Sequence, residues 1–203
     1  MYTEYRDARV PHTAAYLLPA LKGAVSACGY AASVLDLGCG NGAFTALLAQ
    51  PGWRVTAIDG SLSGIRVARE SFPGIRFLQD DVTGALNSLK SCTFDAVFCV
   101  EVIEHVAAPR LLVRNALRLL RPGGLAVFTT PYHGYLKNLA LAASGRLDQH
   151  FTALWDGGHI KFWSPATLAR LLAEAGFAAP AIQGAGRLPY LWKSMVVTAA
   201  RPA

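Results

Sequence analysis

The chain has 203 residues, of which 53% are hydrophobic and 16% charged, a composition that excludes a disordered protein and predicts one globular domain over residues 1–203. No apolar run reaches the roughly 18 residues of a membrane-spanning helix, and the N-terminus lacks the apolar core of a signal peptide, so we expect a cytoplasmic protein. The net charge is +6, but the 19 Lys and Arg residues are scattered and give no clear nucleic-acid signal. The low charge density leaves peripheral membrane contact open, and the oligomeric state is undetermined.

The first two thirds of the chain alternate between strand-like and helix-like patterns. Residues 1–32 carry apolar side chains at helical spacing, including Tyr16, Leu17 and Leu21, which predicts an N-terminal helical lid over the mouth of a site. Short β-branched runs then alternate with helical segments, a pattern typical of a parallel sheet with helices on both faces. The predicted strands are residues 33–38, 53–59, 75–79, 94–100 and 125–130.

The pattern changes after Pro131. Residues 132–163 are rich in aromatic side chains and histidine and show no strand alternation, so we expect a cap insert after the fifth strand. A helix is predicted to begin with Ser164 as its N-cap and Pro165 in its first turn, and to end at Gly176. Apolar runs around 179–184 and 195–200 predict an antiparallel hairpin that closes the sheet.

The run VLDLGCGNG, residues 34–42, lies where the first strand ends and a helix begins. Glycines at such a turn let the backbone approach a ligand at the carboxyl edge of the sheet. Gly38, Gly40 and Ala43 also satisfy the dinucleotide pattern G-x-G-x-x-G/A. Asp59, at the end of the next strand, suits the ribose of NAD or of S-adenosylmethionine. This run alone therefore leaves both cofactors open.

Three features favour S-adenosylmethionine. Asp36 stands two residues before Gly38, where a carboxylate would repel a pyrophosphate but could face a cationic amino-acid group. The chain leaves no room for a second domain to hold the substrate of a hydride donor, and it contains no Tyr-x-x-x-Lys pair. An NAD-dependent oxidoreductase is therefore the least favoured alternative.

Several motifs in order resemble those of class I S-adenosylmethionine-dependent methyltransferases. After VLDLGCGNG come AIDGS, FLQDDV, FDAVFCVEVIEHV, and LLRPGG followed by TTP. The resemblance covers residues 33–131 strongly and 159–200 more loosely, and it implies a Rossmann-like α/β fold whose seven-stranded, mostly parallel sheet ends in a reversed hairpin. It also implies that Asp59 holds the ribose and that Asp81 holds the adenine amine. Asp80 could take this role in place of Asp81. The implied cofactor-binding residues are Asp36, Gly38, Cys39, Gly40, Asn41, Asp59, Gly60, Asp80, Asp81, Val82, Val100 and Glu101.

The segment EVIEHV places Glu101, Glu104 and His105 on one face if it is helical. Two carboxylates and an imidazole suit a divalent ion such as Mg²⁺ or Zn²⁺, and His159 in GGHIKFWSP is the expected fourth ligand. The two segments are similar to those of the ubiquinone-pathway O-methyltransferases, and the ligand types are also similar to those of small-RNA 2′-O-methyltransferases, which hold magnesium. The alternative is that these side chains cap a helix or contact the methionine amino group without a metal.

The resemblance implies methyl transfer from S-adenosylmethionine. We expect His159, Glu104 and His105 to be catalytic, because a base or a metal at this place would lower the pKa of an acceptor hydroxyl. The aromatic insert would then enclose a small, largely apolar acceptor, phenolic or similar to a quinone precursor, or it would simply pack as a cap. An RNA methyltransferase and a silent S-adenosylmethionine-binding protein remain alternatives.

Overall fold

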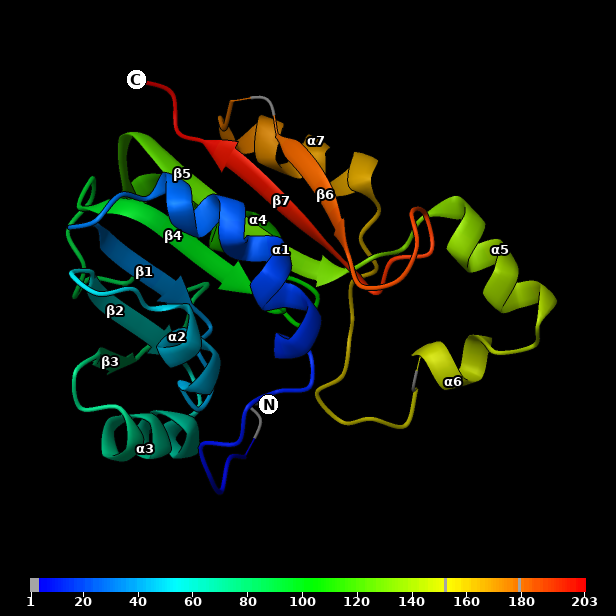
Figure 1. Ribbon diagram of the computed structural model, residues 1–203, viewed down its shortest axis with the longest axis horizontal. Coiled ribbons are helices and arrows are strands. Elements are labelled where there is room, and N and C mark those ends of the chain that lie inside the picture. The colour runs from blue at the N-terminus through cyan, green and yellow to red at the C-terminus, as the bar shows by residue number, and fades with distance from the viewer. Residues whose placement is uncertain (1–3, 152, 179) are drawn as a thin grey trace.

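The computed structural model describes residues 4–151, 153–178 and 180–203. The described residues form one seven-stranded sheet in the order β3-β2-β1-β4-β5-β7-β6, with helices on both faces (Figure 1). In chain order the elements are α1 Ala14–Ala27, β1 Ser33–Leu37, α2 Ala43–Leu48, β2 Arg54–Asp59, α3 Leu62–Ser71, β3 Arg76–Gln79, β4 Phe94–Val100, α4 Pro109–Leu119, β5 Leu120–Pro131, α5 Tyr135–Ala143, α6 Leu147–Phe151, α7 Pro165–Ala175, β6 Ala181–Ala185 and β7 Ser194–Ala200.

The sheet confirms the Rossmann-like architecture with a reversed C-terminal hairpin. Strands β1 to β5 pair in parallel, whereas β7 is antiparallel to both β5 and β6. The five predicted strands agree with the observed ones to within one residue at each end, except at the start of β5. There the strand begins five residues earlier than the predicted 125–130: Leu120 pairs with Phe94, and an irregularity separates this pair from the regular register that resumes at Leu125. Local periodicity could not show this, because the pairing depends on β4.

Two layers of helices bury the sheet. On one face α4 and α7 place Leu112 and Leu168 against the central strands, and on the other face α1 and α2 place Leu17 and Phe44 there. Because side chains alternate along a strand, Asp36 points to the face that α2 covers, between two leucines that point the other way.

The C-terminal helix begins and ends where the sequence predicts. The Ser164 hydroxyl accepts a hydrogen bond from the Thr167 amide at 3.3 Å, Pro165 occupies the first turn, and Gly176 ends the helix with a φ of 103°. The predicted hairpin follows as β6 and β7. Ala179, where its first apolar run was expected to begin, lies outside the described residues.

The segment predicted as a lid, residues 1–32, and the segment predicted as a cap, residues 132–163, lie in different parts of the fold. Helix α1 lies against β6, β7 and α2 on the face of the sheet, and the residues that precede it run to the glycine turn. There the Asn41 side chain donates to the backbone oxygens of Asp7 and Arg9 at 2.9 and 3.0 Å. The insert forms α5 and α6, which project from the end of the sheet (Figure 1). Among the described helices, none is both long enough and apolar enough to cross a bilayer.

Candidate functional site

The glycine turn after β1 forms one wall of a cavity of about 540 Å³ at the carboxyl edge of the sheet. Gly38 has a φ of 92°, and a Cβ at this position would overlap the side chain of Val102. Gly40 has a φ of 55°, and a Cβ there would lie 2.6 Å from the Tyr5 hydroxyl oxygen. Side chains at either position would be strained and would crowd the cavity, so the glycines keep the backbone close to a ligand.

Asp59 joins this turn to the end of β2. Its two carboxylate oxygens accept hydrogen bonds from the amides of Gly40 and Ser61, each at 2.8 Å. A carboxylate has about four acceptor positions, so two remain for the hydroxyls of a ribose. Burial raises the pKa of Asp59, and the two amide donors oppose that rise. Asp59 lines the cavity, as a residue that holds ribose must.

Asp36 is buried beside the turn and does not line the cavity. One carboxylate oxygen accepts a hydrogen bond from the Thr45 hydroxyl at 2.6 Å, and the other has no hydrogen-bond partner among the described residues. Burial raises the pKa of Asp36 to about 6. An unpartnered buried carboxylate oxygen is costly, and a ligand ammonium group nearby would offset part of that cost.

Asp36→Asn should reduce the pH dependence of the free energy of unfolding. A carboxyl whose pKa is raised to about 6 in the folded protein destabilises that state increasingly as the pH rises from about 4 to 6, by up to about 3 kcal/mol. Chemical denaturation at pH 4 and pH 7.5 measures both proteins. We expect the loss of stability between these values to be smaller in the variant, and an equal loss in both proteins would contradict the buried ionisation.

The cavity includes half of the predicted cofactor residues. Asp81 lies on its wall and Asp80 does not, which favours Asp81 for the adenine amine over its neighbour. A volume within the range of about 300–1,000 Å³ suits a small-molecule ligand. The predicted cofactor residues that line the cavity are Gly38, Asp59, Gly60, Asp81, Val82 and Glu101.

Two other predicted cofactor residues, Cys39 and Asn41, lie in the turn itself. The Cys39 thiol is buried in a small apolar cluster with Ala57 and Ile65, so only the backbone of this residue lies in the turn. Asn41 fastens the N-terminal segment, as described above. Val100 packs against the core on the α1 face and is not among the residues that line the cavity.

The segment after β4 differs from the expected helix. Residues 101–106 form a turn, and α4 begins only at Pro109. Glu101 has a φ of 54°, and its carboxylate accepts hydrogen bonds from the hydroxyls of Thr129 at 2.9 Å and Ser194 at 3.2 Å. These contacts occupy both carboxyl oxygens of Glu101, and Glu101 is not part of the group of possible metal ligands found among the described residues. The prediction that all three EVIEHV side chains share one face is therefore corrected, and Glu101 is left out of the cluster.

Glu104, His105 and His159 do come together. One ligand atom from each lies within 4.8 Å of the others, in the part of the chain that the structure describes. Both Glu104 carboxyl oxygens are buried without a hydrogen-bond partner there, and burial, together with the charge of Glu101, raises the pKa of Glu104 well above its usual range. His105 Nδ1 lies 3.0 Å from the Gly157 carbonyl oxygen, which can only accept, so Nδ1 is the donor and Nε2 is the nitrogen left to face an ion. Burial lowers the pKa of His159 to about 4, which leaves this imidazole neutral. This donor set fits a divalent ion.

Backbone hydrogen bonds hold the two distant segments together. The amides of Ile160 and Lys161 donate to the Glu104 carbonyl oxygen at 2.9 and 3.0 Å. The His105 and His159 rings then meet edge to face with centroids 4.8 Å apart, and the Trp155 ring lies 5.5 Å from that of His159. The end of the insert thereby completes a cluster that begins at the end of β4.

Sequence reasoning missed several residues of the cavity. Tyr5, Thr83, Gly157 and Gly158 line it. Thr83 directly follows the FLQDDV motif and the two glycines begin GGHIKFWSP, so of these four only Tyr5 lies outside the recognised motifs. Tyr5 is anchored by its amide, which donates to the Ser63 hydroxyl at 3.0 Å. No local pattern marks Tyr5, because its place depends on how the N-terminus crosses the glycine turn.

Comparisons with known proteins agree with this geometry. Residues 2–180 match a family model described as a methyltransferase domain. The ubiquinone biosynthesis O-methyltransferase of Methylocella silvestris is 38% identical over 152 residues, which cover 72% of this chain and 58% of that protein. Its counterpart in Xanthomonas axonopodis pv. citri is 35% identical and covers 75% and 65%, respectively. A putative methyltransferase structure from Bacillus halodurans superposes with a TM-score of 0.72 at 18% identity, covering 92% of this chain and 99% of that one.

The chain belongs to the methyltransferase domain family and has the fold of the class I S-adenosylmethionine-dependent methyltransferases. Within that class, its sequence is similar to the ubiquinone biosynthesis O-methyltransferases. The chain spans less than two thirds of the length of these two relatives.

Proposed function

We propose that the protein transfers a methyl group from S-adenosylmethionine to a hydroxyl of a small, largely apolar acceptor. One observation carries this proposal. His105 lines the cavity at the carboxyl edge of the sheet, which we call the cofactor cavity, and it also belongs to the cluster with Glu104 and His159. A group that activates a hydroxyl is thereby next to the place where the methyl donor would bind. S-adenosylmethionine supplies an electrophilic methyl group, so alignment of the acceptor accounts for most of the rate enhancement.

We propose further that Glu104, His105 and His159 hold a divalent ion. Such an ion would lower the pKa of the acceptor hydroxyl. The chain supplies a buried carboxyl group and two imidazoles, and the hydrogen bond from His105 Nδ1 to a backbone carbonyl fixes the orientation of that ring. Without an ion, His159 remains available as a general base, because its pKa of about 4 leaves the ring unprotonated and able to accept a proton at neutral pH.

The aromatic residues of the insert lie in different surroundings. Trp155 is 54% exposed and borders the His105 and His159 rings, where it could stack on an aromatic acceptor. Tyr132 and Trp163 instead pack into the core, and Tyr135 is exposed on α5. Of these four aromatic residues, only Trp155 is placed to support an apolar, phenol-like acceptor. We assign it that role.

Calorimetry should detect binding of S-adenosylmethionine and S-adenosylhomocysteine and no binding of NAD(H) at matched concentration. Binding of NAD(H) alone would contradict the proposed cofactor. Turnover with methyl-labelled S-adenosylmethionine can then be screened against phenols, quinone precursors, sugars and RNA. We expect transfer to apolar phenols. Transfer to RNA alone would favour the nucleic-acid alternative, and cofactor binding without any turnover would indicate a silent binding protein.

A further inference from the structure

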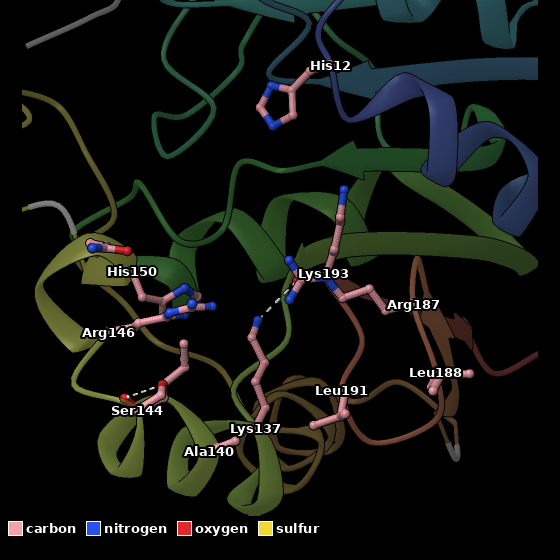
Figure 2. Close-up of a pocket in the computed structure, with 12 residues that line it drawn as sticks. His12, Lys137, Ala140, Ser144, Arg146, His150, Arg187, Leu188, Leu191 and Lys193 are labelled. Atoms are coloured by element: carbon pink, nitrogen blue, oxygen red, sulfur yellow. Dashed lines mark hydrogen bonds between the residues drawn. The ribbon is translucent and has the colours of Figure 1, made fainter.

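A second cavity, which we call the basic cavity, lies between the insert and the loop that joins β6 to β7. Its volume is about 860 Å³. Figure 2 shows Lys137 of α5 ending between Arg146 on the insert and Arg187 on the loop, with His12 across the opening. The residues that line it are His12, Lys137, Ala140, Leu141, Ser144, Arg146, Gln149, His150, Arg187, Leu188, Leu191 and Lys193.

The charge of this cavity is one-sided. Its lining includes Lys137, Arg146, Arg187 and Lys193 and no Asp or Glu. The ion pairs found among the described residues involve other arginines, so none of these four cations is neutralised by an ion pair there. The arrangement differs from an ordinary solvated surface, on which charges of both signs are interspersed.

The cations also destabilise one another. Lys137 is only 6% exposed, and its ammonium group donates to the backbone oxygens of Tyr132 at 2.8 Å and Lys193 at 3.4 Å. Burial and the charge of Arg187 lower the pKa of Lys137 to about 8, and the charge of Glu101 opposes this shift only in part. Burial, Lys137 and Arg187 likewise lower the pKa of His150. A bound anion would offset this repulsion, which is the usual reason for like charges to gather in a cavity.

The remaining lining is apolar. Ala140 and Leu141 come from α5, and Leu188 and Leu191 come from the β6–β7 loop, where they are 71% and 39% exposed. Arg187 has a φ of 67°, a left-handed conformation that is rare for a residue with a side chain and that often marks a binding loop. The cavity thus presents a cationic surface beside an apolar one, which suits a ligand with both characters.

We propose that the basic cavity binds the phosphate group of an amphipathic organic phosphate, whose apolar part lies against Leu188 and Leu191. A phosphate carries more negative charge than a carboxylate and therefore neutralises four cations better. The guanidinium groups of arginines can also form paired hydrogen bonds with phosphate oxygens. Lys137 acts electrostatically on Glu101, and His150 acts on His159, so the cavity lies close to the methyl-transfer site. We further infer that this phosphate belongs to the methyl acceptor, and this step rests on the proposed function. Phosphate binding in the basic cavity does not depend on that function.

Calorimetry with hexyl phosphate, without S-adenosylmethionine, tests the proposal. We expect hexyl phosphate to bind more tightly than hexanoate or inorganic phosphate, and binding to weaken with salt. Arg187→Gln and Arg146→Gln should each raise Kd about tenfold or more, because each removes a charged hydrogen bond. The matched control is Arg66→Gln on the exposed side of α3, which should leave Kd unchanged. No binding, or binding insensitive to both cavity variants, would overturn the proposal.

Vesicle sedimentation distinguishes a soluble phosphate from a lipid headgroup. Binding to phosphatidate vesicles that Arg187→Gln abolishes would place the phosphate on a lipid, and binding of hexyl phosphate alone would place it on a soluble molecule. The two proposals fail separately. If the protein transfers methyl groups but does not bind hexyl phosphate, only the proposed phosphate binding in the basic cavity is wrong. If it binds hexyl phosphate but not S-adenosylmethionine, only the proposed methyl transfer is wrong.

Discussion

Removal of divalent metal should abolish methyl transfer by this protein, and added Mg²⁺ or Zn²⁺ should restore it. His159→Ala should lower kcat/KM by about a hundredfold or more, since loss of a direct ligand costs at least as much as loss of the groups that orient ligands. The affinity for S-adenosylmethionine should remain nearly unchanged, because His159 does not line the cofactor cavity. Turnover with and without chelator, together with calorimetry of the cofactor, measures both effects.

Glu104→Gln provides the second variant for this prediction. It keeps the size of the buried side chain and removes the anionic ligand, so the protein should fold and lose both metal affinity and turnover. Glu70→Gln, at an exposed position of α3, is the matched control and should change neither. If chelators have no effect while His159→Ala still removes activity, His159 is a general base and the proposed ion is wrong.

Asp59→Ala should weaken S-adenosylmethionine binding by about ten- to a hundredfold, the equivalent of about 1.5–3 kcal/mol for charged hydrogen bonds. The loss has two sources. The ribose hydroxyls lose their acceptor, and the Gly40 amide loses the carboxylate that holds the glycine turn at 2.8 Å. Calorimetry of S-adenosylmethionine and S-adenosylhomocysteine measures the change, and an unchanged affinity would mean that the ribose lies elsewhere.

Asp95→Ala is a control for the structural part of this effect. Asp95 also holds a backbone amide, that of Ser33 at 2.6 Å, and it forms an ion pair with Arg121 at 2.8 Å. It lies at the start of β4, whereas the cofactor cavity lies at the opposite ends of the strands. This variant should lower the melting temperature and leave cofactor affinity intact. Equal losses of affinity in both variants would assign the Asp59 effect to general destabilisation.

The site was predictable where its residues follow strand ends. Gly38, Asp59 and Asp81 stand at the ends of three successive strands, and parallel strands bring their carboxyl ends to one edge of a sheet. The position of Glu101 was not predictable in this way. Its spacing from Glu104 suggested a shared helix face, but the segment is a turn, and the Glu101 carboxylate accepts hydrogen bonds from the hydroxyls of Thr129 and Ser194.

The basic cavity lay beyond sequence reasoning altogether. Its four cations are spread over residues 137–193 and form no run in the sequence, where they appeared to be scattered surface charges. The fold of the insert and the β6–β7 loop brings them together. A charge count along the chain cannot detect such a site, because electrostatic interaction depends on distance in space.

The sequence by itself determined the class of fold, the strands of the parallel sheet apart from the start of β5, the limits of α7 and the glycine turn that lines the cavity. These features depend on local periodicity, on caps and on glycine conformations, which operate over a few residues. The sequence also predicted that His159 lies beside Glu104 and His105, and the structure brings these three together. The tertiary structure alone decided that Glu101 stays out of this cluster, that Tyr5 crosses the glycine turn, and that the insert helps to form a basic cavity. Those contacts join segments far apart in the chain, so they depend on the packing of the whole domain.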